Sequence, residues 1–209
     1  MNLTIQRVRQ ELAAYGVSPD DSLCEKIVCY VELLLRWNSK ISLTTVTDPV
    51  EIVRFHFGES LFGAKQLEIK NGRLADVGTG AGFPGVPLKL YSAAIELFLI
   101  EPNLKKATFL GEVARLLKLD HIEILRFRME DLPVESGDFD IITTRALGKH
   151  QVLLRWARNR LSTGGKVALW IADRDATYLA SDRSYEWSEP IKIPQSHHRV
   201  ILQGSPELR

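Results

Sequence analysis

One glycine-rich stretch decides the fold class of this chain: Asp76-Val77-Gly78-Thr79-Gly80-Ala81-Gly82-Phe83-Pro84-Gly85. It directly follows residues 73–77, which are typical of a buried β-strand. Glycines behind a strand let the backbone turn sharply and approach a ligand closely. The stretch therefore predicts a strand that ends in a ligand-binding turn.

Strand-like and helical segments alternate after this turn. The pattern predicts further strands over residues 94–100, 122–126, 139–144 and 166–171, and helices over residues 105–119 and 150–161, the second broken by Gly164-Gly165. Two more β-rich pieces cover residues 189–193 and 198–203. Repeated strand–helix units predict an α/β, Rossmann-like fold: a mostly parallel seven-stranded sheet with helices on both faces.

The first sixty residues have helical rather than strand periodicity. Leu23, Ile27, Val31 and Leu34 form one apolar stripe. The run Asp48-Pro49-Val50-Glu51 combines a capping aspartate, a proline at the first helical position and a glutamate three residues after the cap, which predicts a helix start. We therefore expect an N-terminal helical extension over residues 1–60 and a ligand-binding domain over residues 61–209.

The composition is that of a globular protein. The 209 residues include 27 Lys and Arg, 26 Asp and Glu, and 45% hydrophobic residues, which is too apolar for a mainly disordered chain. No window approaches the ~18 apolar residues of a membrane-spanning helix, and no signal peptide is visible. Cys24 and Cys29 lie in one helical stretch and are interpreted as buried thiols of a reducing compartment. These features predict a cytoplasmic protein without a membrane partner.

Positive charge is concentrated in one segment. Residues 141–172 hold six basic side chains and no acidic one, although the whole chain has a formal charge of +1. Such a cluster is suited to binding phosphates. The alternative, a solvated helix face with acidic neighbours in space, stays open at this point.

The acidic residues around the turn predict a nucleoside cofactor. Glu101 ends the second predicted strand, where a carboxylate can accept hydrogen bonds from both ribose hydroxyls. Residues 80–85 also fit the G-x-G-x-x-G pattern of dinucleotide binding, so NAD is a candidate. Asp76 suits a cationic sulfonium better than a pyrophosphate, and this favours S-adenosylmethionine. We expect Asp76, Gly78, Thr79, Gly80 and Glu101 to bind it.

The sequence also resembles the RsmG (GidB) family of 16S ribosomal RNA methyltransferases over nearly its whole length. The glycine-rich stretch followed by Glu101 and Lys105-Lys106 carries the most specific part of this resemblance. The other matching pieces are Leu35-Arg36-Trp37-Asn38, Leu43-Thr44, Asp48-Pro49, His56, Phe109-Leu110, Arg128-Met129-Glu130, Arg145-Ala146 and Gly164-Gly165. Departures from the family pattern occur at Ser42, Gly58-Glu59-Ser60 and Ala172-Asp173.

The resemblance implies a SAM-dependent methyltransferase fold and transfer of a methyl group to N7 of one guanine in the decoding-region loop of 16S rRNA. The implied partner is 16S rRNA, either in the small ribosomal subunit or in its assembly intermediate. The resemblance further implies that Gly78, Phe83, Met129, Glu130 and Arg145 contact the cofactor, with Glu101 near its ribose.

Two absences favour a ring nitrogen as the methyl acceptor. Methylation of exocyclic amines often uses an Asn/Asp-Pro-Pro-aromatic motif after the fourth strand, where this chain has Thr143-Thr144-Arg145-Ala146. Methylation of pyrimidine C5 needs a cysteine nucleophile, and both cysteines lie in the N-terminal helices. Arg145 is our catalytic candidate, because it emerges beside the expected methyl group. The alternative is a structural arginine paired with Asp140 or Glu130.

Other basic residues are candidates for binding RNA. Lys105 and Lys106 begin a helix, where cations are unfavourable unless a phosphate or Glu101 is near; the alternative, two solvent-exposed lysines without a partner, stays open. The remaining candidates are Arg126, Arg128, Lys149, Arg155 and Arg158.

We interpret His56 as a core residue. We expect no metal site, because the histidines lack metal-ligand spacing. Two other functions remain under consideration, an NAD(P)-dependent oxidoreductase and a non-catalytic RNA-binding assembly factor.

Overall fold

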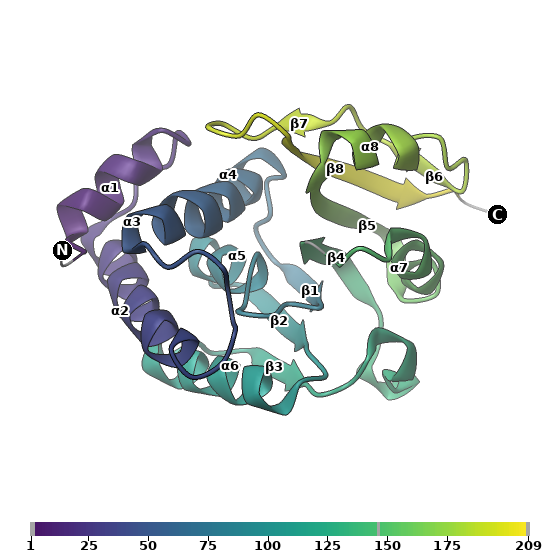
Figure 1. Cartoon of the computed structure of the whole chain (residues 1–209). Helices are drawn as coiled ribbons and strands as arrows, with labels where there is room; N and C mark the ends of the chain where they lie inside the picture. Colours follow the sequence, from purple (N-terminus) through teal and green to yellow (C-terminus); the bar gives the residue numbers. More distant parts are fainter. Residues whose placement is uncertain (1–2, 146, 208–209) are drawn as a thin grey trace.

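The computed structural model describes residues 3–145 and 147–207. A single twisted sheet runs through the molecule and separates two groups of helices (Figure 1). Its strands are β1 (Gly72–Val77), β2 (Ile95–Ile100), β3 (Ile122–Leu125), β4 (Phe139–Arg145), β5 (Leu161–Ala172), β6 (Tyr185–Trp187), β7 (Ile191–Lys192) and β8 (Arg199–Pro206).

The strand order confirms the predicted α/β class. Strands lie in the order β3-β2-β1-β4-β5-β8-β6, and the first five are mutually parallel. Strand β8 runs antiparallel to β5. The sequence predicts seven strands, whereas the described sheet has eight, because β6, which pairs with β8, was not among the predicted strands; the two-residue β7 falls within the predicted piece 189–193. The order reverses between β1 and β4, so the crevice for a ligand lies at the carboxyl ends of these strands.

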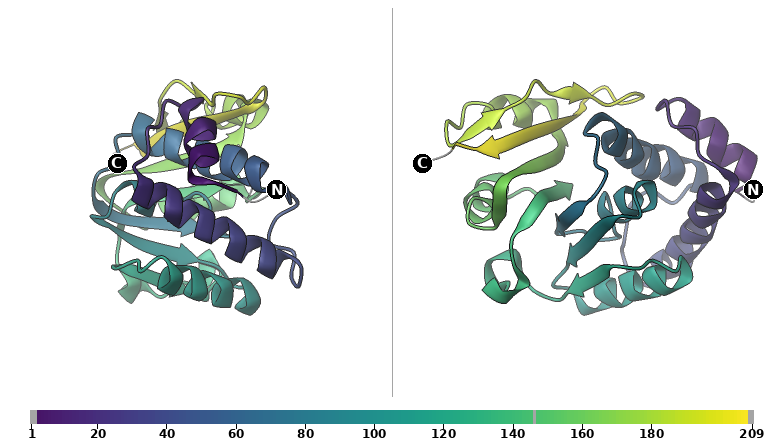
Figure 2. Two further views of the ribbon diagram at one scale, coloured as in Figure 1. Left: turned by 90° about the vertical axis from the view of Figure 1, so that its left-hand side faces the viewer. Right: turned by 180° about the vertical axis from the view of Figure 1, so that it is seen from behind.

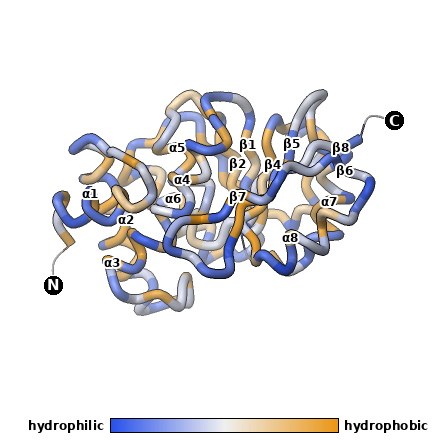
Figure 3. Tube along the Cα trace, turned by 90° about the horizontal axis from the view of Figure 1, so that it is seen from above, coloured by the Kyte–Doolittle hydropathy of each residue, from blue (hydrophilic) through white to orange (hydrophobic). Residues whose placement is uncertain are grey.

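Helices cover both faces, as predicted. One face carries α1 (Ile5–Ala13), α2 (Asp21–Asn38), α3 (Pro49–Ile52), α4 (Glu59–Gln66), α5 (Gly85–Tyr91) and α6 (Leu104–Leu116). The other face carries α7 (His150–Ala157) and α8 (Asp173–Leu179). Figure 2 shows the purple and blue N-terminal helices on one side and the green and yellow C-terminal elements on the other. Figure 3 shows hydrophobic segments gathered along the strands, as expected for a sheet buried on both faces.

The N-terminal helices are built into the core of the sheet. Asp48 Oδ1 accepts a hydrogen bond from Glu51 N at 2.9 Å, which confirms the predicted helix start. The run then continues through one π-helical segment (Val53–Gly58) into α4. The predicted domain boundary after residue 60 falls inside this run. Buried residues of α1, α2 and α4 share one apolar cluster with strands β1 and β2.

Two sequence predictions about local structure were wrong. Gly164-Gly165 do not precede the fifth strand but lie inside β5, which begins at Leu161. Gly164 has φ +79°, and a β-bulge shifts the β4–β5 register at the same level, as glycine in a strand often indicates. Cys29, predicted to be a buried thiol, is exposed, whereas Cys24 is buried as predicted. Helix α8 and strand β6 were not predicted from the sequence.

Short 3-10 segments replace a full helix between β3 and β4. They cover Met129–Asp131 and Val134–Ser136. The first of them follows directly on the loop after β3, so Met129 and Glu130 lie at the carboxyl edge of the sheet, beside the ends of β1 and β2.

We predict that Gly63→Ala destabilises the fold by about 1–3 kcal/mol, the usual cost of overpacking. A Cβ at Gly63 would collide with the Trp170 ring and lie 2.8 Å from Ile201 Cδ1. Gly111→Ala in α6 is the matched control, because the nearest atom would be 3.9 Å away. Denaturant unfolding should show a lower midpoint for the first variant and an equal or higher midpoint for the second. Equal stability of both variants would contradict the packing described here.

Candidate functional site

A cavity of about 230 Å³ opens at the carboxyl ends of β1 and β2. It contains four of the residues predicted to bind the cofactor, Gly78, Glu101, Met129 and Glu130. Its other lining residues are Val77, Ile100, Pro102, Phe127, Arg128, Leu147 and Lys149. The fold thus brings together residues from three separate strand ends, as the sequence analysis expected.

The glycine turn fits a closely held ligand. Gly78 and Gly80 have φ of +67° and +60°, a backbone region that side chains rarely allow. A Cβ at Gly78 would lie only 2.8 Å from Leu147 Cδ1, across the cavity. The turn therefore presents bare backbone to the cavity, and a side chain at Gly78 would fill the space.

Glu101 is held against the turn. Its Oε2 accepts a hydrogen bond from Gly80 N at 3.0 Å, and its Oε1 accepts one from Asn103 N at 3.0 Å. Each carboxylate oxygen keeps a further acceptor site, because an ionised carboxylate has about four. These remaining sites suit vicinal hydroxyls, such as those of a ribose, and the carboxylate itself is fixed in place before any ligand binds.

Asp76 lies beneath the turn and is completely buried. Its Oδ2 accepts hydrogen bonds from Thr79 Oγ1 at 2.6 Å and Gly85 N at 2.9 Å, and its Oδ1 accepts one from Thr143 Oγ1 at 3.3 Å. Burial raises the pKa of Asp76 to about 6, although these hydrogen bonds oppose the rise. The geometry shows Asp76 and Thr79 organising the turn; direct contacts with a cofactor stay predictions.

Phe83 faces the N-terminal helices. Its ring packs against Tyr30, Phe57 and His56, with centroid distances of 5.5, 5.2 and 4.8 Å. The hydroxyl of Tyr30 donates a hydrogen bond to Ala81 O in the same turn. The predicted contact of Phe83 with the cofactor stays a prediction. What the structure shows is that the turn is packed against α2 and the π-helical segment.

Arg145 lies at the end of β4, as expected, but its partner differs from either alternative. Its Nη1 donates a hydrogen bond to Phe55 O at 2.9 Å, and its Nη2 lies 3.5 Å from Glu59 Oε2. Glu59 is fully buried and also pairs with Arg199, Nη2 to Oε1, at 2.5 Å. One carboxylate thus serves two guanidinium groups, and Arg145 keeps uncompensated positive charge beside the carboxyl edge of the sheet. Ala146 lies outside the described residues.

The short motifs near the N-terminus form one hydrogen-bonded loop. Asn38 Oδ1 accepts hydrogen bonds from Leu43 N and Thr44 N, and Asn38 Nδ2 donates to Thr44 O. Thr44 Oγ1 in turn lies 2.9 Å from His56 Nε2. The sequence interpretation of His56 as a core residue agrees with its partial burial against Phe83.

The basic segment 141–172 does not form one surface. Arg160 is buried and donates hydrogen bonds to Pro133 O at 3.1 Å and Gly137 O at 2.9 Å. Arg145 is held internally as well. Lys149 and Arg155 are exposed and Arg158 is half-buried. The cluster is therefore partly structural, and a single electrostatic footprint, one of the two interpretations left open by the sequence, does not extend over the whole segment.

The other predicted RNA-binding residues lie near the cavity. Lys105 and Lys106 begin α6, directly after the loop that follows Glu101, and Asn103 caps this helix through its side chain. Arg126 and Arg128 are exposed on the loop after β3. Both groups follow adjacent strands, so they lie along the same edge of the sheet.

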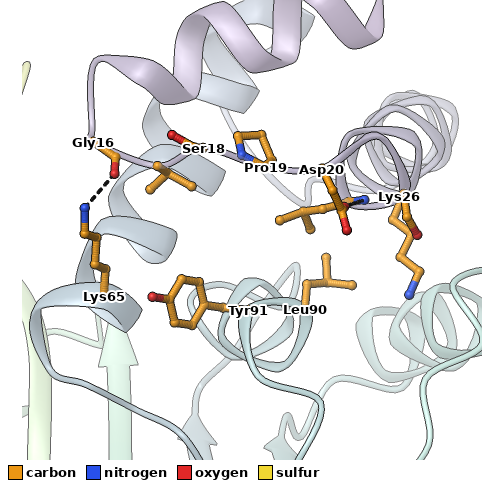
Figure 4. A pocket seen from close by; sticks show the side chains of 11 residues that line it. Gly16, Ser18, Pro19, Asp20, Lys26, Lys65, Leu90 and Tyr91 are labelled. Atoms are coloured by element: carbon orange, nitrogen blue, oxygen red, sulfur yellow. Dashed lines mark hydrogen bonds between the residues drawn. The ribbon is translucent and has the colours of Figure 1, made fainter.

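A larger cavity, about 570 Å³, lies elsewhere (Figure 4). It is formed by the turn between α1 and α2, Lys65 of α4 and Tyr91 at the end of α5, and Lys65 Nζ donates to Gly16 O at 2.8 Å. Because α5 returns from the turn to the start of β2, this cavity is at the opposite edge of the sheet. It contains none of the predicted site residues.

Residues 3–145 and 147–207 contain neither a candidate metal site nor a candidate membrane-spanning helix. No three or more His, Cys, Asp or Glu side chains are grouped so that they could hold a metal ion. No helix in this part of the chain combines the length and apolar character needed to cross a bilayer.

Comparison with protein families decides the relationship. The family model described as "rRNA small subunit methyltransferase G" (GidB) matches residues 23–198. This chain belongs to that family. The match includes the glycine turn, Glu101, Arg145 and the loop that contains Met129, and only Arg199 among the site residues described above lies just beyond it.

Members of the family in other bacteria are similar over much of their length. A protein of Desulfitobacterium hafniense named ribosomal RNA small subunit methyltransferase G is 39% identical over 78% of this chain and 66% of its own length. A protein of the same name from Caldanaerobacter subterraneus is 37% identical over 96% of this chain and 90% of its own length.

A solved structure shares the fold. The ribosomal protein L11 methylase of Lactobacillus delbrueckii superposes with a TM-score of 0.61 at 18% identity, over 74% of this chain and 80% of its own. The sheet of this GidB-family protein is thus of the Rossmann-like methyltransferase type that the sequence predicted.

Sequence reasoning missed two residues of this GidB-family site. Glu59 was noticed only as a departure from the family pattern, and its pairing with Arg145 and Arg199 depends on segments up to 140 residues apart, so no local signal revealed it. Phe127 was not considered, although an aromatic residue between Arg126 and Arg128 is a visible signal.

We predict that His56 makes the fold less stable in acid. Burial lowers the pKa of His56 to about 3, and the positive charges of Arg145 and Arg199 act in the same direction. The unfolded chain takes up this proton below pH ~6.5 but the folded chain does not, so the free energy of unfolding should fall as the pH falls from ~6.5 toward about 3. Relative to His56→Gln, wild-type stability should drop by about 2 kcal/mol between pH ~7.5 and pH ~5.

Denaturant unfolding of both proteins at several pH values measures this difference. The raised pKa of Asp76 makes the free energy of unfolding rise as the pH falls, opposite to the effect of His56. Asp76 is present in both proteins, so its contribution cancels in the comparison. His197→Gln, at an exposed histidine, is the control and should keep the wild-type pH profile. A parallel profile for His56→Gln and wild type would show that His56 titrates normally in the folded protein.

Proposed function

We propose that this protein transfers a methyl group from S-adenosylmethionine to N7 of a guanine in the decoding-region loop of 16S rRNA. The observation that carries the proposal is the cavity in which Gly78, Glu101, Met129 and Glu130 meet. Membership of the methyltransferase G family supports a ribosomal RNA of the small subunit as substrate. We infer that the reaction takes place in the cytoplasm, because ribosomal RNA is the proposed substrate.

The residues present fit this cofactor. Bare backbone at Gly78 and Gly80 allows close approach, Glu101 can accept from ribose hydroxyls, and Ile100, Pro102 and Met129 give the cavity apolar walls for a purine. When bound, the cofactor supplies an electrophilic methyl group on a sulfonium. The protein's own part is to bind the cofactor and the RNA, to orient them toward one another and to exclude water.

Guanine N7 makes few demands on the protein. It carries an in-plane lone pair and no proton, so no general base is needed, and positioning with electrostatic support suffices. Arg145 is the residue that we assign to this support. Its guanidinium group lies at the end of β4, is fixed by Phe55 O, and shares Glu59 with Arg199. A guanidinium group can donate to guanine O6 or to a phosphate.

Family membership does not favour the other functions considered. An NAD(P)-dependent oxidoreductase would need a second parallel nucleotide-binding half, where this chain has the antiparallel strands β6, β7 and β8. A non-catalytic assembly factor has no need of a preformed glycine turn with Glu101 fixed against it.

The decisive experiment is transfer of a tritiated methyl group to unmethylated small subunits, to naked 16S rRNA and to assembly intermediates. Mass spectrometry of the labelled RNA should locate a single N7-methylguanosine. Absence of transfer to all three substrates, or label on a different atom, would refute the proposal. Calorimetry with S-adenosylmethionine and with NAD separates the methyltransferase from the oxidoreductase.

We predict that Arg145→Ala lowers the rate of methyl transfer about tenfold or more, the scale of one lost charged hydrogen bond. Single-turnover rates with saturating RNA measure the effect. In this variant the buried carboxylate of Glu59 keeps only Arg199 as a partner, which lowers stability. The unfolding transition of the variant is therefore measured together with its rate of methyl transfer. A wild-type rate in a folded variant would show that Arg145 is only structural.

We predict that RNA affinity falls steeply with salt. If the seven basic candidates contact phosphates, raising the salt from about 50 to about 200 mM should weaken RNA binding on the order of 10³-fold. Lys105→Gln combined with Lys106→Gln should reduce the slope of log affinity against log salt by about one to two. Lys70→Gln with Lys118→Gln, at exposed lysines outside the site, is the control. A shallow slope in the wild type would exclude an electrostatic RNA surface.

A further inference from the structure

The basic side chains of this molecule fall into two groups. Arg54, Arg73, Arg145 and Arg199 are held by acidic partners, and Arg160 by backbone carbonyls. Among the described residues, no acidic group lies within ion-pair distance of the seven RNA-binding candidates, Lys105, Lys106, Arg126, Arg128, Lys149, Arg155 and Arg158. The exposed members of this group, Lys105, Arg126, Arg128, Lys149 and Arg155, therefore present their charge to solvent, where a ligand can reach it.

Two cations of the unpaired group lie at the cavity itself. Arg128 and Lys149 line it, and Arg126 is exposed two residues before Arg128. Two acidic side chains line the same cavity: Glu101 is buried and accepts hydrogen bonds from Gly80 N and Asn103 N, whereas Glu130 is exposed. Among the exposed charges at or next to the cavity, the cations Arg126, Arg128 and Lys149 outnumber the exposed lining carboxylate Glu130, which suits a polyanion passing over it.

Phe127 is an aromatic side chain in the middle of these charges. It is the second residue after β3, lies between Arg126 and Arg128, and lines the cavity while 38% of its surface stays exposed. Leu104 at the start of α6 is 55% exposed and follows β2, the strand paired with β3. Two large apolar side chains thus remain uncovered at one edge of the sheet, among unpaired cations.

This combination matches the surfaces that hold single-stranded nucleic acids. Aromatic rings stack on bases of any identity, while neighbouring lysines and arginines follow the phosphates. In the proposed site, Glu101 binds the ribose of the cofactor and Gly78 belongs to the glycine turn. The cavity lined by Phe127 contains both residues, so it is the adenosine end of that site. A base on Phe127 therefore lies away from the methyl group and is not the target guanine.

We propose that Phe127, flanked by Arg126 and Arg128, stacks on an unpaired rRNA base next to the target guanine and holds the target strand across the mouth of the cofactor cavity. This inference rests on the proposed function. Phe127 is then a determinant of substrate binding, and it adds affinity without contacting the reacting atoms.

The test compares wild type with Phe127→Ala, Phe127→Trp and Tyr178→Ala. Tyr178 of α8 is 64% exposed and serves as the matched control for loss of an exposed aromatic ring. The readouts are KM and single-turnover rate on the RNA substrate that the wild type methylates, and the calorimetric affinity for S-adenosylhomocysteine. Phe127→Ala should raise KM about tenfold, the scale of one lost base stack, with an unchanged maximal rate and unchanged cofactor affinity.

Further outcomes separate the alternatives. Phe127→Trp should keep the wild-type KM, and Phe127→Ala should keep the wild-type salt slope, whereas Arg128→Ala should lower that slope by about one. A loss of S-adenosylhomocysteine affinity in Phe127→Ala would overturn the inference in favour of stacking on the cofactor's adenine. A KM equal to that of Tyr178→Ala would overturn it as well. If the wild type methylates no RNA, the proposed function itself fails, and this inference fails with it.

Discussion

The buried carboxylate of Asp76 is the interaction on which the site depends. It ties three elements together: Thr79 in the turn, Gly85 at the start of α5, and Thr143 of β4. A carboxylate buried without partners would be very costly, so its position requires all three donors to be in place. Once they are, the turn can adopt the positive φ values of Gly78 and Gly80 in a fixed position, with its bare backbone toward the cavity.

The N-terminal helices complete the site rather than merely extend the chain. Tyr30 reaches the turn through Ala81, Phe83 packs against Phe57 and His56, and Glu59 holds Arg145 and Arg199 at the edge of the sheet. The single buried carboxylate of Glu59 orients two guanidinium groups, so a net positive charge remains at this edge of the sheet. Positive charge at this edge suits the phosphates of the proposed RNA substrate.

The predictions from sequence succeeded where the signal was local. Glycine positions, the capping run at Asp48 and the spacing to Glu101 each depend on residues close together in the chain. They failed where long-range pairing decided the outcome. Gly164-Gly165 suggested a break between a helix and the fifth strand. Pairing of β5 with β4 instead keeps both glycines inside β5, at a β-bulge. The basic run 141–172 suggested one surface, but Arg160 was drawn inward by the carbonyls of residues 132–137.

The sequence by itself determined the class of fold, the position of the glycine-rich turn and the family, because these follow from periodicity and from short motifs whose spacing is set by local backbone geometry. Only the tertiary structure decided which cations are internal and which are available, that Glu59 is the partner of Arg145, and that Phe127 stands at the cavity mouth. Those properties depend on which strand ends the sheet order brings together, and side-chain burial and charge pairing exist only after the strands have paired.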